Sequence, residues 1–175
     1  VNGQYQGAAF HFSQGLEAGV NRMRFGPDGA LYIGGVGMVG GWSWREKQSG
    51  LQRLQYNGHP VFEMLAVRAK PGGLDIELTQ PLAKNYVPNV KNFIVQQWWY
   101  LPTKDYGGPK KDLENLNIAK LEISGDRKHI YLELPQMKSP RIVYLRLPED
   151  MKSESGLNLW AGETWYSMNE VPGTE

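Results

Sequence analysis

The sequence predicts an all-β protein. Short runs of β-branched, aromatic and other apolar residues alternate with polar residues, and clusters of glycine, proline, asparagine and aspartate separate the runs. Hydrophobic residues make up 41% of the 175 residues, which is too many for a disordered chain and enough to form a core. No apolar run approaches the roughly 18 residues that a membrane span needs.

The first third of the chain is rich in glycine, and four short strands are expected in it. They cover Tyr5–Phe12, Gly19–Phe25, Ala30–Gly35 and Leu51–Tyr56. The sequence Pro27–Gly29 predicts a hairpin between the second and third of these strands, because proline presets φ and glycine accepts a positive φ. Asn57-Gly58 predicts another hairpin, between the fourth strand and the run Val61–Ala69.

The rest of the chain contains fewer glycines, more lysines and longer strands. Six strands are expected after Gly72: Leu74–Thr79, Val90–Tyr100, Ile118–Ile123, His129–Leu134, Ile142–Leu147 and Leu159–Tyr166. Turn signals recur about every 8–12 residues between them, which is the pattern of an immunoglobulin-like β-sandwich. One short helix is expected at Lys111–Leu116.

The first segment has too few strands to bury both faces of its sheet. The segment either packs on the sandwich or stacks on sister sheets outside this chain, as the blades of a propeller do, and we favour the second alternative. We therefore expect a propeller-blade-like antiparallel sheet over residues 1–58, followed by an immunoglobulin-like β-sandwich over residues 59–175. The chain starts with valine and shows no signal peptide, so we expect a processed chain or a piece of a longer propeller protein.

The segment Gly19–Gly35, GVNRMRFGPDGALYIGG, resembles one blade of a six-bladed propeller. The resemblance is to the sugar dehydrogenases that use pyrroloquinoline quinone, the family of sorbosone and glucose dehydrogenases. In that family FGPDGxLYxG forms an inner hairpin, and Leu51–Gly58 resembles the third strand of the same blade. The wider run from Gln6 to Leu65 is similar to the final blade of large bacterial members, in which a β-sandwich tail follows. Five stretches are similar to that tail: Leu74–Pro81, Gln97–Tyr100, Tyr106–Pro109, Ser124–Lys128 and Val143–Leu147.

The resemblance implies that the chain is the C-terminal part of a periplasmic or extracellular sugar-dehydrogenase-like protein. Its partner would be the remainder of the propeller or another β-rich chain. In the family the catalytic histidine and most cofactor contacts lie in earlier blades. No catalytic residue is therefore expected in this chain, and pyrroloquinoline quinone would belong to the parent protein. Two alternatives stay open: a non-catalytic carbohydrate-binding module and a structural component of an extracellular assembly.

Two groups of residues are candidates for binding. Asn21 and Arg22 stand where the family's inner strand faces the central channel. Arg22 either pairs with a carboxylate of a cofactor or substrate, or is a structural cation between adjacent blades. The second group consists of aromatic residues whose rings can stack on the C–H faces of sugars: Trp42, Trp44, Trp98, Trp99, Tyr100 and Tyr106.

Each aromatic candidate also has a structural interpretation. Trp42 and Trp44 lie in a glycine-rich loop, where they either bind a sugar or fill space between the propeller and the tail. The three consecutive residues Trp98–Tyr100 must alternate between the two faces of a strand, so at least one lies on the outer face or at an edge. They either form an exposed platform with Tyr106 or supply the buried tryptophan that is common in sandwich cores.

Other kinds of site are not expected. The net charge is +1, so the chain lacks the basic excess of a nucleic-acid-binding surface. The absence of cysteine excludes disulfides, cysteine-ligated zinc, iron–sulfur clusters and covalently attached c-type haem. The histidines, His11, His59 and His129, share no metal-ligand spacing. Three aspartates are expected to cap backbone amides in turns: Asp28, Asp126 and Asp150.

Overall fold

The computed structural model describes residues 3–37, 47–105 and 107–173, and it confirms the all-β class. The strands form three antiparallel sheets. Within the described residues the one helical segment is the short 3₁₀ helix η1 (Val90–Asn92), and none is long and apolar enough to cross a membrane. The chain divides into two compact units, residues 12–60 and residues 1–11 with 61–175.

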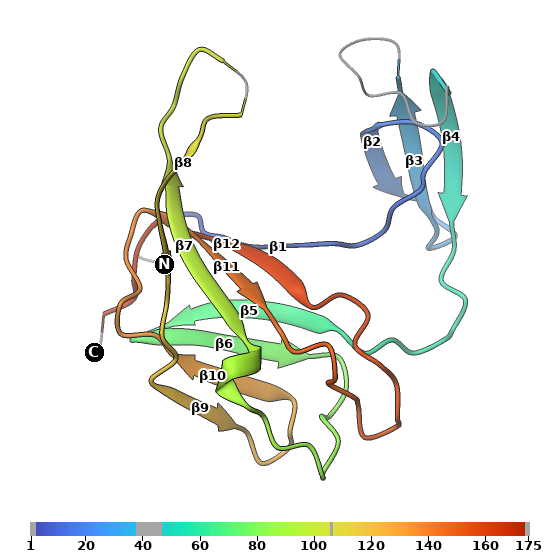
Figure 1. The fold of residues 1–175 in the computed structure, drawn as a ribbon. Helices are drawn as coiled ribbons and strands as arrows, with labels where there is room; N and C mark the ends of the chain where they lie inside the picture. The colour runs from blue at the N-terminus through green and yellow to red at the C-terminus, as the bar shows by residue number, and fades with distance from the viewer. Residues whose placement is uncertain (1–2, 38–46, 106, 174–175) are drawn as a thin grey trace. The chain divides into compact units, whose positions relative to one another are not determined.

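The unit of residues 12–60 contains a three-stranded sheet, with its strands in the order of the sequence (Figure 1). The strands are β2 (Val20–Phe25), β3 (Leu31–Val36) and β4 (Ser49–Leu54). The predicted hairpin between the first two is confirmed. Gly29 has φ of 74°, and its N–H donates to the carbonyl of Gly26 at 3.0 Å. A side chain at Gly29 would strain this turn, which is why glycine stands there.

The larger unit consists of two antiparallel sheets that lie face to face (Figure 1). One has the order β1-β12-β11-β7-β8, and the other has the order β5-β6-β10-β9. The strands are β1 (Gly7–Phe10), β5 (Met64–Lys70), β6 (Gly73–Leu78), β7 (Ile94–Tyr100), β8 (Lys110–Asn115), β9 (Lys120–Ile123), β10 (His129–Glu133), β11 (Arg141–Arg146) and β12 (Glu163–Met168).

The core lies between these two sheets, and strand alternation supplies it. Strand β6 buries every second residue, Leu74, Ile76 and Leu78, and β11 does the same with Val143 and Leu145. Loops close the ends of the core with other fully buried side chains: Phe62, Leu82, Leu134, Leu147 and Met151. The remaining face of each sheet is free to carry polar and aromatic groups.

The N-terminal strand belongs to the two-sheet unit and not to the blade-like segment in which we expected it. Strand β1 pairs with β12, with Phe10 opposite Thr164, and the Thr164 hydroxyl donates to the carbonyl of Ala9 at 3.0 Å. The chain therefore enters the unit of residues 12–60 after His11 and leaves it at Pro60, which differs from the predicted segments 1–58 and 59–175. The alternation of a strand indicates which face is buried but not which sheet it joins.

The hairpin predicted at Asn57-Gly58 is wrong. A turn forms there, since the N–H of His59 donates to Asn57 Oδ1 at 3.0 Å. The strands on either side do not pair, however: β4 lies in the three-stranded sheet and β5 in the four-stranded one. The turn connects the two units and closes no hairpin.

The helix predicted at Lys111–Leu116 is also wrong, because this segment is strand β8. Strand β8 pairs with β7 at the edge of the five-stranded sheet, where Glu114 stands opposite Gln97 and accepts a hydrogen bond from its Nε2 at 2.6 Å. This long-range pairing outweighs the local preference of a lysine- and glutamate-containing segment for helix. Two predicted strands, Val90–Tyr100 and Leu159–Tyr166, start later than expected, since η1 precedes β7 and β12 begins only at Glu163.

Candidate functional site

The predicted channel-facing residues lie on the exposed strand β2. Arg22 Nη1 donates to the carbonyl of its neighbour Asn21 at 2.9 Å, and both side chains are exposed. The register of the sheet places Arg24 beside Tyr32, and Tyr32 beside Arg53, on one face. Arg22 shares this face because it is two residues from Arg24. The face therefore gathers guanidinium groups, which suit carboxylate or phosphate ligands.

Asp28 caps its turn as predicted and also balances this charge. Its Oδ1 accepts a hydrogen bond from the N–H of Ala30 at 3.2 Å. Its Oδ2 accepts from Arg53 Nη2 at 2.7 Å and from the Tyr32 hydroxyl at 3.1 Å. The hydrogen bond from Arg53 is the main reason that the pKa of the Asp28 carboxyl lies below its ordinary value. Asp28 thus ties the β2–β3 turn to strand β4.

Large apolar side chains are exposed on both faces of the three-stranded sheet. Met23 and Phe25 stand opposite Ile33 and Leu31 on one face, and they are 64% and 71% exposed. Leu51 stands opposite Gly34, which places it on the other face, the one that carries Arg22 and Arg53, and it is 78% exposed. A solitary sheet that buries one face on a core normally presents polar residues on the other. This sheet instead offers apolar surface in both directions.

The candidates for sugar stacking differ in how far the structure exposes their side chains. Trp42, Trp44 and Tyr106 lie outside the described residues. Trp98 is 1% exposed, which favours the structural interpretation of this residue, a buried tryptophan, over sugar stacking. Trp99 is half-buried and its Nε1 donates to Asp112 Oδ2 at 2.6 Å, whereas Tyr100 is exposed.

Trp98 belongs to a row of aromatic rings that the sequence analysis did not find. The row lies on the face of the five-stranded sheet that points away from the core, because Val95 and Gln97 alternate with Trp98 and point inward. The Trp98 ring is 6.3 Å from that of Tyr100 and 6.4 Å from that of Tyr144, which is 5.5 Å from Trp165. Tyr144 and Trp165 are directly opposite each other on β11 and β12, a cross-strand pairing that is not visible in the sequence.

This aromatic row leads to a hollow at the end of strands β11 and β12. The Tyr144 hydroxyl donates to Glu163, and burial together with this carboxylate raises the pKa of Tyr144 to about 12. Glu163 also lines the hollow, which has a volume of about 370 Å³ and includes Arg146 and Trp160. Trp160 was predicted within the strand Leu159–Tyr166 and was given no binding role, whereas the structure places it in the loop before β12.

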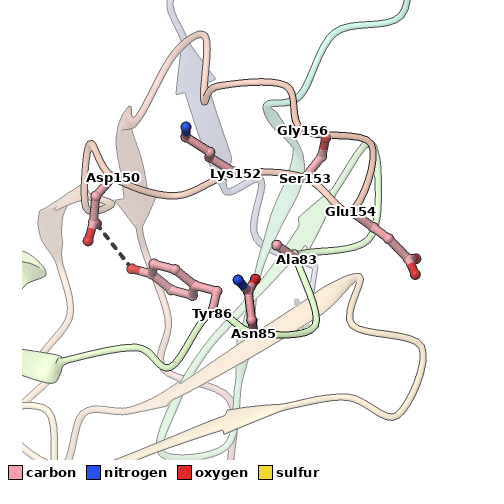
Figure 2. A pocket seen from close by; sticks show the side chains of 8 residues that line it. All are labelled: Ala83, Asn85, Tyr86, Asp150, Lys152, Ser153, Glu154 and Gly156. Carbon is pink, nitrogen blue, oxygen red and sulfur yellow. Dashed lines mark hydrogen bonds between the residues drawn. The ribbon is translucent and has the colours of Figure 1, made fainter.

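A second hollow, of about 380 Å³, lies between the loops that contain Tyr86 and Asp150 (Figure 2). The Tyr86 hydroxyl donates to Asp150 Oδ1 at 3.3 Å, and burial, with the Asp150 charge adding to it, raises the pKa of Tyr86 to about 12. A phenol with this pKa stays protonated at neutral pH and donates a hydrogen bond without acting as a base. Asp150 therefore contacts a tyrosine across the pocket, a role that the turn context did not predict.

Arg127 holds one wall of this second hollow in place. Its guanidinium donates to three backbone carbonyls, those of Leu82 at 2.9 Å, Ala83 at 2.7 Å and Tyr86 at 3.1 Å. One side chain thus contacts three carbonyls of this loop, of which that of Ala83 also accepts from the N–H of Tyr86 at 3.0 Å. The arrangement is structural.

The histidines do not converge. His11 and His59 are exposed, whereas His129 Nδ1 lies 3.2 Å from Asp75 and lines a shallow hollow of about 500 Å³ on the four-stranded sheet. Among the described residues no group of three or more histidine, aspartate or glutamate side chains is arranged to hold a metal ion. The carboxylate of Asp126 accepts from the N–H of Lys128 at 3.1 Å, so its predicted capping role is confirmed.

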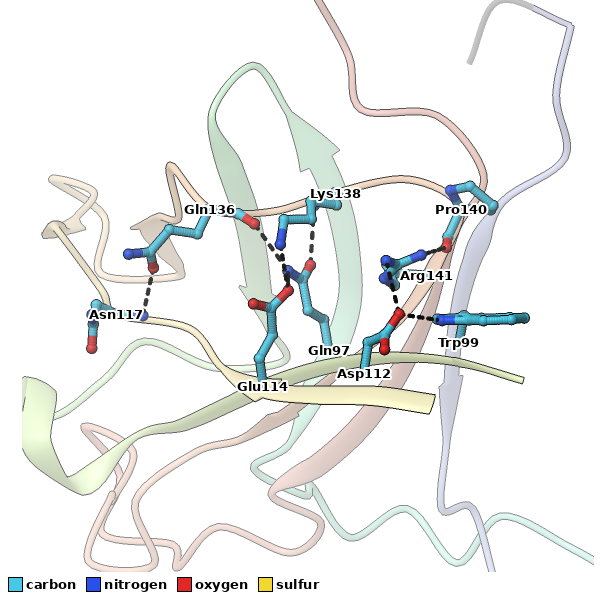
Figure 3. A network of polar contacts seen from close by, with 9 residues as sticks. All are labelled: Gln97, Trp99, Asp112, Glu114, Asn117, Gln136, Lys138, Pro140 and Arg141. Atoms are coloured by element: carbon cyan, nitrogen blue, oxygen red, sulfur yellow. Dashed lines mark hydrogen bonds and ion pairs between the residues drawn. The ribbon is translucent and has the colours of Figure 1, made fainter. Parts of the chain in front are cut away.

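A buried polar network joins β7, β8 and the loop before β11 (Figure 3). Gln97 is fully buried, and its amide is satisfied on both sides. Its Nε2 donates to Glu114 and to the carbonyl of Gln136 at 2.9 Å, and its Oε1 accepts from the N–H of Lys138 at 3.0 Å. Lys138 Nζ closes the network with an ion pair to Glu114 at 2.8 Å. A buried polar group is tolerated when it is fully hydrogen-bonded in this way.

This network predicts a stability that depends on pH. The hydrogen bonds from Lys138 and, next, from Gln97 lower the pKa of Glu114 in the folded protein below the ordinary 4.5. The contribution of the Glu114 carboxylate is therefore fully present above that value, and it is lost as the pH falls through the lower folded pKa. We expect the melting temperature of Glu114→Gln to lie below that of the wild type at about pH 7, and the gap to shrink once the pH falls below 4.5 and to close below the lowered pKa of the folded protein. A gap that is constant across a series of calorimetric melts at falling pH would contradict this role.

Taken together, the described residues offer binding surfaces: a guanidinium-rich and apolar sheet in residues 12–60, and an aromatic row with an adjacent hollow in the two-sheet unit. In comparisons with known proteins, no family model, no curated protein and no solved structure matched the chain.

Proposed function

We propose that residues 12–60 are one blade of a larger β-propeller and that the two-sheet unit is an accessory module beside it. The observation that carries the proposal is the exposure of large apolar side chains on both faces of the three-stranded sheet, Met23 and Phe25 on one and Leu51 on the other. Each apolar side chain of this size gains about 1.5–3 kcal/mol when it is fully buried. A sheet placed between two sister sheets, as in a propeller, collects that gain on both faces.

The accessory module is proposed to be immunoglobulin-like. If β5 to β12 are taken as strands A, B, C, C′, D, E, F and G, the sheet orders read A-B-E-D and G-F-C-C′. Immunoglobulin-like sandwiches have the order A-B-E-D in one sheet and pair G, F and C in the other. Strand β1 is an addition beside strand G.

The parent protein is proposed to be a secreted or periplasmic sugar dehydrogenase of the sorbosone and glucose dehydrogenase type. The proposal uses the resemblance of Gly19–Gly35 to the family's inner hairpin, and the exposed Arg22 on that hairpin suits a position beside the central channel. The parent protein would oxidise a sugar with a quinone cofactor that is held by blades outside this chain. Among the described residues we identify no nucleophile or general base for that reaction.

The decisive experiment is made on the protein as its source produces it. We expect an intact mass well above the 19.8 kDa of this chain, and sugar-dependent reduction of an electron-accepting dye that requires added pyrroloquinoline quinone. A native mass of 19.8 kDa, or a larger protein that oxidises no sugar, would overturn the assignment.

A pair of matched variants tests the blade contact itself. Leu51→Glu would place a charge at the proposed contact between blades and should lower the melting temperature of the intact protein by several degrees. Leu65→Glu places the same charge at an exposed position of β5 and should leave the melting temperature of the intact protein nearly unchanged. Equal effects of the two substitutions would argue against burial of Leu51 on a sister sheet.

A further inference from the structure

We propose that the two-sheet unit binds a neutral carbohydrate in the hollow beside Trp160. The site goes beyond the proposed function, because it needs only residues of this unit and no part of a propeller. Its lining combines one exposed indole with a guanidinium and two carboxylates, namely Trp160, Arg146, Glu149 and Glu163. Its volume of about 370 Å³ falls in the range of roughly 300–1,000 Å³ that small-molecule sites occupy.

Trp160 is exposed and yet anchored. The side chain is 69% exposed, which is unusual for the largest apolar residue. Its backbone N–H donates to the carbonyl of the fully buried Phe62 at 2.8 Å, and the preceding Leu159 forms a parallel bridge with Phe62. The N–H of Leu159 donates to Met151 at 3.2 Å. The core therefore fixes the backbone that presents the ring, so that only the side chain of Trp160 has to be ordered when a ligand stacks on it.

The polar groups of the hollow suit hydroxyl groups. Arg146 and Glu163 are directly opposite each other on β11 and β12, and Glu163 is held by the hydroxyl of Tyr144. A sugar ring presents hydroxyls that donate to a carboxylate and accept from a guanidinium, and it also presents an apolar C–H face. The indole of Trp160 can stack on that C–H face, while Arg146 and Glu163 can form hydrogen bonds with the hydroxyls at the edge of the sugar ring.

The charge of the hollow selects among carbohydrates. Glu149 and Glu163 supply two carboxylates against the one guanidinium of Arg146, so an acidic sugar would meet net repulsion. A neutral sugar would not. The site also continues beyond one ring, because Tyr144 connects Glu163 to Trp165, which is 37% exposed. A neutral oligosaccharide therefore fits this surface better than a single sugar.

The test is a binding titration of the intact chain with oligosaccharide probes, followed by tryptophan fluorescence and calorimetry. The neutral probes are cello-, xylo-, malto- and mannohexaose, and the acidic probe is an oligogalacturonate of equal length. We expect at least one neutral probe to bind and the acidic probe not to bind. We expect Trp160→Ala to weaken that binding about tenfold or more, and Trp160→Phe to retain part of it, because a smaller ring keeps part of the stacking area.

Tyr5→Ala is the matched control, since it removes an aromatic side chain that is almost fully exposed elsewhere in the same unit. It should bind as the wild type does, and circular dichroism should show all three variants folded. The proposal is overturned if no neutral probe binds at millimolar concentration, if only the acidic probe binds, or if Trp160→Ala binds as tightly as the wild type. Each of these results leaves the mass and dye-reduction test of the propeller proposal unaffected.

Discussion

Replacing Trp98 with alanine is expected to lower the free energy of unfolding by about 3–5 kcal/mol, the range for truncation of a buried tryptophan. The side chain is 1% exposed, and its ring contacts those of Tyr100 and Tyr144. The ammonium of Lys110 lies 3.8 Å from the ring centroid, so a cation–π contact is lost as well. Urea unfolding followed by circular dichroism should show a lower midpoint with an unchanged slope.

Trp165→Ala is the matched control for this measurement. Trp165 lies on the same sheet face and at the other end of the aromatic row, but it is partly exposed. Its truncation removes less buried area, so we expect about half the loss or less. If Trp98→Ala costs no more than Trp165→Ala, the outer face of this sheet does not form the packed layer that the structure describes.

For the aromatic candidates around Trp98, the sequence predicts which side chains share a face of the strand but not which of them is buried. The alternation of Trp98, Trp99 and Tyr100 between two faces follows from strand geometry and was predicted. Which of them is buried depends on Tyr144 and Lys110, which reach the Trp98 ring from other strands. The alternative of a buried tryptophan assumed a place in the core between the sheets, whereas Trp98 is buried on the outer face.

The fold was predictable where the signal is local. Proline and glycine turns, and alternation over four to eight residues, indicated the all-β class and most strands. The errors at β1 and at Asn57-Gly58 concern which strand pairs with which. The segment predicted as a helix at Lys111–Leu116 is a strand because it pairs with β7. In each case the outcome is decided by contacts between distant segments.

The candidate carbohydrate site was not predictable for the same reason. The sequence pattern places Trp160 inside the predicted strand Leu159–Tyr166, and no spacing marks it as a binding residue. Its significance comes from the bridge between Leu159 and Phe62 and from the pairing of Arg146 with Glu163. The pairing that places Arg146 opposite Glu163 depends on the register of β11 and β12, and this register is known only from the fold.

Alanine at Gly73 is expected to cost about 1–3 kcal/mol or more, as overpacking of a close-packed site does. A Cβ at this position would lie 2.0 Å from the carbonyl oxygen of Leu132 and 3.0 Å from its carbonyl carbon. These are backbone atoms of β10, which is paired on one side with β6 and on the other with β9, so they cannot move aside without breaking hydrogen bonds in the sheet. Gly125→Ala is the control, since a Cβ there meets nothing within 4 Å. Thermal melts should separate the two variants by several degrees, and similar melting temperatures would mean that β6 and β10 do not approach each other as closely as this register requires.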